Sequence, residues 1–150
     1  MEIKVVATNR KASHEYFLFE RYEAGLVLQG SEIKSIRAGQ VSLAEAYVSL
    51  DGREAWLVDA HIAPYEQASI FGHAPRRPRK LLLHRPEIRR LWNEVRQKGV
   101  TIVPLRIYLK NGRAKLEIAV AKGKKLYDKR ETIARRDSER DIERRYKIRT

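Results

Sequence analysis

An Asn-Gly pair between two alternating segments is the feature that most constrains how this chain folds. Residues 103–110 and 113–120 both alternate apolar and polar side chains, and Asn111–Gly112 lies between them. Asn-Gly is a preferred two-residue turn for a β-hairpin because both positions adopt a positive φ. The sequence therefore predicts a hairpin whose apolar face pairs Leu109 with Ala114, Ile107 with Leu116, Leu105 with Ile118 and Val103 with Val120.

The other face of the same hairpin is predicted to be polar. In this register Arg106 lies opposite Glu117, and Tyr108 lies opposite Lys115. Lys115 should therefore point outward, away from the core.

Further strands are indicated at shorter intervals. Asp51–Gly52 separates apolar residues at 48–50 and 56–58, a pattern typical of a second hairpin. The run 16–19 is rich in residues that favour strands. Together with the first hairpin, these segments predict about five strands.

Two helices are indicated by capping residues and apolar spacing. The first is short: Ser31 is expected as its N-cap, and Gly39 follows its end. The second begins at Pro86 and ends before Gly99. An apolar stripe with helical spacing runs along it and consists of Ile88, Leu91, Trp92 and Val95. A long, mobile loop is expected from Pro64 to Pro78.

These elements predict a mainly β fold. About five short strands with helices at the edges suit a small, partly open β-barrel of the oligonucleotide-binding type with flanking helices. Composition alone does not separate this barrel from an SH3-like barrel. A length of 150 residues is that of one domain, and we expect the barrel domain to span residues 1–122.

The chain changes character after residue 122. Residues 123–150 hold eleven Lys or Arg and six Asp or Glu, with few apolar side chains. Such a segment buries too little apolar surface to fold alone, so we expect a basic C-terminal tail that is disordered in isolation. The part from Ile133 onward contains no Gly or Pro and can become helical on a charged partner.

Charge narrows the range of partners. The chain has 32 Lys and Arg against 19 Asp and Glu, a net charge of +13 at pH 7, which attracts polyanions. Arg, which binds phosphate and stacks on bases, is the more frequent cation and favours nucleic acid over a membrane surface. No apolar stretch is long enough for a signal peptide or a membrane span, and Cys is absent. We expect a soluble, cytoplasmic protein; a basic protein without a polyanion partner is the alternative.

Residues suited to catalysis or metal binding are not clustered in the sequence. The four His residues lie far apart without metal-binding spacing, and no Gly-rich phosphate loop is present. We therefore expect no metal, no cofactor and no enzymatic activity. An active site gathered from distant residues is the alternative that this pattern leaves open.

Three basic segments are candidates for nucleic-acid binding. Segment 122–130 surrounds Tyr127 with charges, so its cations can neutralise phosphates while the ring stacks on a base. Arg76–Lys80 precedes an apolar run, and Asn9–Lys11 precedes the first expected strand. A solvated tail and a solvated loop are the alternatives for the first two. The residues by themselves indicate a barrel that binds RNA or DNA.

Four motifs carry a family resemblance. They are NRKASHEYF at Asn9–Phe17, EAGLVLQGSEIKSIRAG at Glu23–Gly39, RKLLL at Arg79–Leu83 and AKGKKLYDKR at Ala121–Arg130. In this order they resemble the SsrA-binding protein family, also called small protein B. One of these motifs alone has little specificity, but the four together are very specific and cover the chain from about residue 9 to residue 130.

The resemblance implies an oligonucleotide-binding-type barrel that acts in ribosome rescue without catalysis. Members of this family bind the transfer-RNA-like domain of transfer-messenger RNA and deliver it to stalled ribosomes with elongation factor Tu. The tail enters the decoding region and the empty messenger path. We expect a monomer with no membrane partner. A ribosomal or RNA-chaperone module without a rescue role, and an RNA-modifying enzyme, are the alternatives.

The resemblance also implies site residues. The family's contacts with transfer-messenger RNA fall on Glu23, Leu82 and Lys115. The hairpin register agrees for Lys115, whereas Leu82 could equally be a core residue. The basic segments add further expected RNA contacts, which are Asn9, Arg10, Lys11, Arg79 and Lys80.

A second set of positions matches the family's decoding-region segment. These positions are Gly123, Lys124, Lys125, Tyr127, Asp128, Lys129 and Arg130. Many members of the family carry His where this chain has Tyr127. The change removes a titratable imidazole but keeps a ring that can stack.

Overall fold

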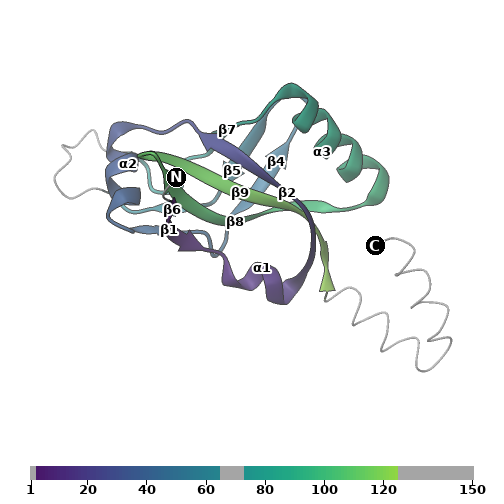
Figure 1. Ribbon diagram of the computed structural model, residues 1–150, viewed down its shortest axis with the longest axis horizontal. Coiled ribbons are helices and arrows are strands. Elements are labelled where there is room, and N and C mark those ends of the chain that lie inside the picture. Colours follow the sequence, from purple (N-terminus) through teal and green to yellow (C-terminus); the bar gives the residue numbers. More distant parts are fainter. Residues whose placement is uncertain (1–2, 65–72, 125–150) are drawn as a thin grey trace.

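The computed structural model describes residues 3–64 and 73–124 (Figure 1). Three helices lie within them: α1 (Arg10–Glu15), α2 (Gly30–Arg37) and α3 (Arg85–Lys98). The strands are β1 (Ile3–Thr8), β2 (Tyr16–Leu26), β3 (Val41–Ser42), β4 (Tyr47–Leu50), β5 (Ala55–Val58), β6 (His61–Ile62), β7 (Arg79–Leu82), β8 (Thr101–Lys110) and β9 (Arg113–Gly123).

One antiparallel sheet of seven strands dominates the fold, in the order β1-β8-β9-β2-β7-β5-β4. Strands β3 and β6 pair separately. The sheet coils so that β4, at one edge, packs against β8 near the other edge, as in a partly open barrel. The three helices lie at separate places around it (Figure 1). The predicted mainly β class with flanking helices is confirmed.

The estimate of about five strands was too low. The sequence analysis missed β1, which has no regular apolar alternation, and β7, which is four residues long and begins with two cations. It also missed α1, a helix of six residues in which only Ala12 is buried. Elements this short carry too few side chains for a periodic pattern to emerge.

The hairpin around Asn111–Gly112 is present, but its predicted register is right only near the turn. Ile107 pairs with Leu116 as predicted, and Tyr108 pairs with Lys115. A β-bulge follows between Pro104 and Arg106, so the predicted pairs Leu105–Ile118 and Val103–Val120 are wrong. The observed pairs are Pro104–Ile118, Val103–Ala119 and Ile102–Val120.

Proline and Asn9 account for the bulge. Pro104 has no N–H to give to the β-ladder, so the ladder loses no donor at this residue. Asn9 satisfies the two displaced carbonyls: its backbone N–H donates to the Leu105 oxygen at 2.7 Å, and its side-chain Nδ2 donates to the Pro104 oxygen at 2.9 Å.

The bulge divides the apolar residues between two clusters. Val103 and Leu105 point away from the main core and pack with Ala119 and Ala121 beneath Ala12 of α1. The main core lies on the inner face of the sheet, and its fully buried residues include Ile107, Leu116 and Ile118 of the hairpin, Ile36 of α2 and Leu91 of α3. In the part of the chain that the structure describes, no helix is both long and apolar enough to cross a membrane.

The two predicted helices are present, with one change of cap. Helix α2 begins at Gly30 with Gln29 as N-cap, which forms a capping box with Glu32, so the expected cap Ser31 is wrong. Gly39 follows the end of α2 with φ +75°. Helix α3 has Pro86 in its first turn, and Gly99 ends it in the left-handed conformation, as predicted.

A buried ion pair joins α2 to β7. Arg79 and Glu32 are fully buried, and both Nε and Nη2 of Arg79 lie 2.7 Å from Glu32 Oε2. The other carboxylate oxygen accepts from the Gln29 backbone N–H at 2.8 Å and from the Arg77 guanidinium. The remaining Arg79 donors bind the carbonyls of Ala60, Ala74 and Pro75.

This network keeps the Glu32 carboxylate charged inside the protein. Burial by itself raises the pKa of the carboxyl, but the hydrogen bonds from Arg77, the Gln29 N–H and Arg79 outweigh it and hold the pKa below its usual range. Neither charge is tolerable there alone, since an unpaired ion in a protein interior is costly. The pair therefore fixes where β7 lies.

Two predictions fall wholly or partly outside the described residues. The structure does not describe residues 65–72 of the expected loop or residues 125–150 of the expected tail. The described end of the loop is anchored, because His73 is buried and lies 2.9 Å from Ser31 Oγ through Nδ1 and 2.8 Å from the Ile62 carbonyl through Nε2.

Substitution of Glu32 tests the ion pair. Glu32→Gln keeps the shape of the side chain but leaves the charge of Arg79 uncompensated, so the free energy of unfolding at pH 7 should fall by about 3–5 kcal/mol. Chemical denaturation measures the change. Glu45→Gln is the matched control, since it removes the exposed pair with Arg76 and should cost at most about 1 kcal/mol.

The same pair predicts a pH dependence. The folded-state pKa of Glu32 is depressed, so its contribution is complete above the pKa in the unfolded chain and is lost as pH falls toward the folded-state pKa. In acid the difference in stability between the native chain and the Glu32→Gln variant should shrink. A difference that does not change between neutral and acid pH contradicts this assignment.

Candidate nucleic-acid interface

Part of the outer face of the sheet is left open. Along β9, four alternate residues lie on this face: Lys115, Glu117, Ala119 and Ala121. Helix α1 covers the two alanines through the second apolar cluster, whereas Lys115 and Glu117 remain accessible to solvent. We call the uncovered part the open face; it is made by Glu23, Gly25, Leu82, Lys115 and Glu117, and the buried Tyr108 borders it.

A row of paired residues crosses the sheet from β7 to β8. Leu82 pairs with Gly25, which pairs with Lys115 on its other side, and Lys115 pairs with Tyr108. Residues paired in this way lie side by side on one face of a sheet. Two of the three positions that the family resemblance implied, Leu82 and Lys115, are thus brought together from distant parts of the chain.

Gly25 places no side chain at the centre of this row. A Cβ atom at this position would lie 3.3 Å from the Leu82 Cβ, so even alanine would crowd the leucine. No side chain therefore stands between Leu82 and Lys115 in this row. A base or a ribose can approach the sheet backbone at Gly25, between an apolar and a cationic side chain.

Leu82 is a surface residue. Its exposed fraction is 55%, whereas its neighbour Leu81 is 2% exposed and lies in the core. The alternative that Leu82 is a core residue is therefore wrong.

Glu23 lies in the next row, opposite Glu117. Its Oε2 accepts a hydrogen bond from the hydroxyl of Tyr108 and lies 3.4 Å from Lys110 Nζ. The Tyr108 hydrogen bond holds the pKa of the Glu23 carboxyl below its usual range, and Lys110 and Lys115 add to the effect. The group is therefore a fixed anion at neutral pH, and among the described residues nothing donates to its Oε1.

A fixed acceptor beside a lysine suits RNA. The free oxygen of Glu23 can accept from a ribose hydroxyl or from guanine N–H groups, and the nearby Lys115 can pair with a phosphate. No ion pair within 4.0 Å engages Lys115 in the part of the chain that the structure describes, so its charge is available. Tyr108 is itself buried and positions Glu23 rather than stacking on a ligand.

The basic run Arg76–Lys80 is largely neutralised within the protein. Arg76 lies 3.1 Å from Glu45, Arg77 contacts Glu32, and Lys80 lies 3.7 Å from Glu54. The expected RNA contact at Arg79 is wrong because its guanidinium is fully buried and all its nitrogens are engaged. Lys80 stays at the surface and keeps a place in the candidate interface.

In the segment Asn9–Lys11, one residue stabilises the fold and the other two are exposed to solvent. Asn9 holds the bulge of β8 and serves the fold. Arg10 and Lys11 are exposed on α1. A groove runs from this helix to the open face, and its lining includes Arg10, Arg21, Arg106 and Glu117.

Two of the expected tail residues belong to the barrel. Gly123 is the last residue of β9 and pairs with Tyr16. Lys124 Nζ donates to the Ser13 carbonyl at 2.9 Å and lies 5.3 Å from the Phe17 ring centre. The other expected decoding-region residues lie outside the described residues; they are Lys125, Tyr127, Asp128, Lys129 and Arg130.

Sequence analysis missed the parts played by Gly25 and Tyr108. The hairpin register had placed Tyr108 beside Lys115, but no sequence pattern links it to Glu23, which lies 85 positions earlier. The pairing of β2 with both β9 and β7, which places Gly25 at the centre, depends on the missed strand β7.

Comparisons with known proteins agree on one family. A family model described as SmpB protein matches residues 6–148. The SsrA-binding protein of Roseiflexus castenholzii is 63% identical over 147 residues, which is 97% of this chain and 93% of that protein. The SsrA-binding protein of Desulforudis audaxviator is 57% identical over 141 residues, 94% of this chain and 92% of that protein.

A solved structure is similar over nearly the same length. It is described as "tmRNA-SmpB: a journey to the center of the bacterial ribosome" and shares 46% sequence identity with this chain. The TM-score is 0.67, with 92% of this chain and 94% of that chain covered.

Substitutions at two neighbouring residues on opposite faces of β9 should change the free energy of unfolding by very different amounts. Lys115→Ala removes an outward, unpaired cation and should change the free energy of unfolding by no more than about 0.5 kcal/mol. Leu116→Ala removes a fully buried side chain and should cost about 2–5 kcal/mol. Denaturant unfolding compares the two; equal effects would contradict the assignment of the faces.

Proposed function

The chain belongs to the SmpB protein family, the SsrA-binding proteins, and on this basis we propose that it is the RNA-binding protein of trans-translation. It binds the transfer-RNA-like domain of transfer-messenger RNA, also called SsrA RNA. It delivers this RNA to stalled ribosomes, where their nascent chains are tagged and released.

The observation that carries the proposal is the row on the open face. Leu82 offers an apolar contact, Gly25 presents no side chain to hinder a base or ribose, and Lys115 offers a cation for phosphate. Glu23 adds a fixed acceptor whose orientation is set by Tyr108. Such a combination reads a single-stranded or looped part of an RNA, where unstacked bases and ribose hydroxyls are accessible.

Charge supports the same conclusion. A net charge of +13 draws the chain toward RNA from a distance, while the few groups of the open face select where it binds. Phosphate contacts release counterions, so affinity should fall as salt rises.

Substitutions on the open face test the binding site. Lys115→Ala should weaken binding to the isolated transfer-RNA-like domain and reduce the slope of log affinity against log salt by about 1. Leu82→Ala and Glu23→Ala should weaken binding while leaving that slope nearly unchanged, because neither removes a cation. A filter-binding or fluorescence titration at several salt concentrations measures both quantities.

Lys98→Ala is the control for a lost positive charge. Lys98 lies at the end of α3, where its partner is Glu94 at 3.8 Å, and its replacement should leave affinity unchanged. Thermal melts of all variants exclude loss of fold. If affinity for the transfer-RNA-like domain is unaffected by all three substitutions on the open face, the proposed site is wrong.

We propose further that the tail acts on the ribosome. Segment 123–130 would bind the decoding region, with Tyr127 stacked on a base, and the part from Ile133 would become helical along the empty messenger path. Lys124, fixed to α1 through Ser13, supports this because it gives the tail a defined starting point on the barrel. The net positive charge of the tail suits a channel lined by ribosomal RNA.

The remaining features of the proposal follow from this role. The chain acts in the cytoplasm as a monomer, forms a delivery complex with elongation factor Tu, and performs no catalysis itself. It needs no metal or cofactor.

Truncation separates the two activities. A chain cut after Lys124 keeps all of β9 and the contacts of Lys124 with α1, so it should fold and bind the transfer-RNA-like domain with only an electrostatic loss of affinity. Tagging of stalled nascent chains in a reconstituted translation system should fail. Full tagging by the truncated chain would reduce the tail to a nonspecific anchor.

The ring at Tyr127 refines this test. Tyr127→Ala should tag at an intermediate rate because a stacking contact worth roughly 1–3 kcal/mol is lost. Tyr127→His should work nearly as well as the native chain, since an imidazole can also stack.

A further inference from the structure

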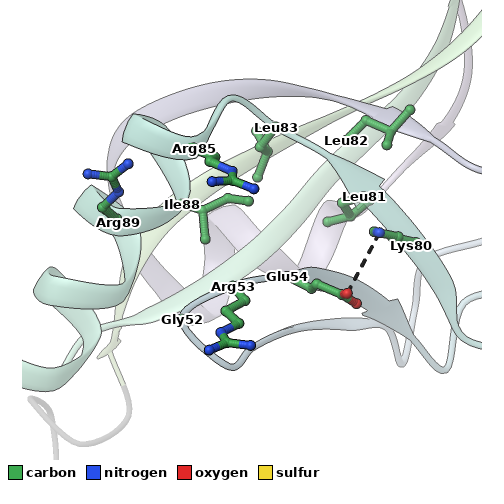
Figure 2. A pocket seen from close by; sticks show the side chains of 10 residues that line it. All are labelled: Gly52, Arg53, Glu54, Lys80, Leu81, Leu82, Leu83, Arg85, Ile88 and Arg89. Carbon is green, nitrogen blue, oxygen red and sulfur yellow. Dashed lines mark ion pairs between the residues drawn. The ribbon is translucent and has the colours of Figure 1, made fainter.

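A groove of about 700 Å³ lies beside the open face, between the β4–β5 turn, β7 and the first turns of α3 (Figure 2). Four of its lining residues are cations: Arg53, Lys80, Arg85 and Arg89. Leu81, Leu83 and Ile88 supply apolar lining. Neither the family motifs nor the basic segments of the sequence had pointed to Arg53, Arg85 or Arg89.

The charge in this groove is not balanced by the protein. Glu54 is the only acid among the lining residues, and it pairs with Lys80 at 3.7 Å, as the dashed line in Figure 2 marks. Arg53, Arg85 and Arg89 are exposed, and in residues 3–64 and 73–124 none of them has a carboxylate within 4.0 Å. Three guanidinium groups therefore face solvent around one depression.

The backbone on one side of the groove is held by contacts within the protein. The Asp51 carboxylate accepts from the backbone N–H groups of Arg53 at 2.9 Å and Glu54 at 2.7 Å, which closes the β4–β5 turn. Gly52 adopts φ +89°, and a Cβ there would lie 3.2 Å from the Trp92 indole nitrogen, so the turn packs tightly on α3. A preformed site pays less ordering entropy on binding.

The groove continues the open face. Lys80 and Leu82, both on β7, line the groove, and Leu82 also forms one end of the row that crosses Gly25 and Lys115. Figure 2 shows Arg85 and Arg89 on the helix side of the groove, Arg53 on the side of the β4–β5 turn, and Lys80 and Leu82 of β7 at one end. A strand of RNA that contacts Leu82 would therefore enter the groove from the end formed by β7.

We propose that this groove binds the sugar–phosphate backbone of the same RNA that occupies the open face, with Arg53, Arg85 and Arg89 pairing with its phosphates. The inference rests on the proposed RNA-binding function. Guanidinium groups suit phosphate because they bind it through two parallel hydrogen bonds. The apolar lining formed by Leu83 and Ile88 contacts ribose carbons and keeps water from the ion pairs.

A triple substitution tests the groove. Arg53→Gln, Arg85→Gln and Arg89→Gln together keep a polar side chain at each position but remove three charges. Binding of the full-length chain to the isolated transfer-RNA-like domain should weaken, and the slope of log affinity against log salt should become shallower by about 1 for each arginine removed. The corresponding Arg→Lys triple variant keeps the charges and should retain most of the slope.

Two comparisons make the outcome specific. Arg89→Gln should weaken binding, whereas Lys98→Gln, on the same helix but outside the groove, should not. If the native chain binds and Lys115→Ala weakens it, but the Gln triple variant matches the native affinity and slope, the groove proposal is wrong while the proposed function stands. If the native chain does not bind this RNA at all, the proposed function itself fails.

One further result would contradict the groove proposal. If the Gln triple variant keeps its affinity for the RNA and yet loses tagging activity in a reconstituted system, the groove serves a different partner.

Discussion

The burial of Arg79 beside Glu32 is the interaction on which the arrangement of the surface depends. Among the described strands, β7 alone joins β2 to β5 in the sheet. Its first residue, Arg79, carries a charge that is stable in the interior because it is paired with the Glu32 carboxylate. Once Arg79 points inward, Leu81 points inward too, and Lys80 and Leu82 point outward by the alternation of a strand. The ion pair thereby determines which residues of the motif RKLLL are free to meet a ligand.

The bulge in β8 is the second constraint, and it decides how much of the outer face stays open. By turning Val103 and Leu105 outward it creates an apolar patch that α1 must cover. The covering helix stops short of Lys115 and Glu117, and Asn9 joins the helix to the bulge. One face of a single strand, β9, is thus partly covered by α1 and partly open to solvent. The open face and the arginine groove beside it meet at Leu82, so one RNA can occupy both.

The sequence predicts the parts of this structure that rest on local pattern. The turn at Asn111–Gly112, the nearby register and the cap of α3 at Gly99 follow from turn chemistry and periodicity, and so does the outward direction of Lys115. The rest depends on contacts between distant residues. Arg79 lies in a basic run, and nothing in the sequence indicates that it is buried. The Pro104 carbonyl at the bulge accepts a hydrogen bond from Asn9, which lies 95 positions earlier in the chain. The resemblance supplied Glu23 and Leu82 as contacts; the register of β2 with β7 and β9 supplied the reason that they lie together.

The most direct test of this account asks which RNA the protein holds in cells. The full-length chain would be recovered from bacterial cells that express it, beside a Leu82→Ala, Lys115→Ala double variant of equal thermal stability, and the bound RNA sequenced. The account predicts that the native chain enriches one stable RNA with a transfer-RNA-like end and that the double variant loses this enrichment. Enrichment of ribosomal RNA alone, or equal enrichment by the double variant, would contradict it.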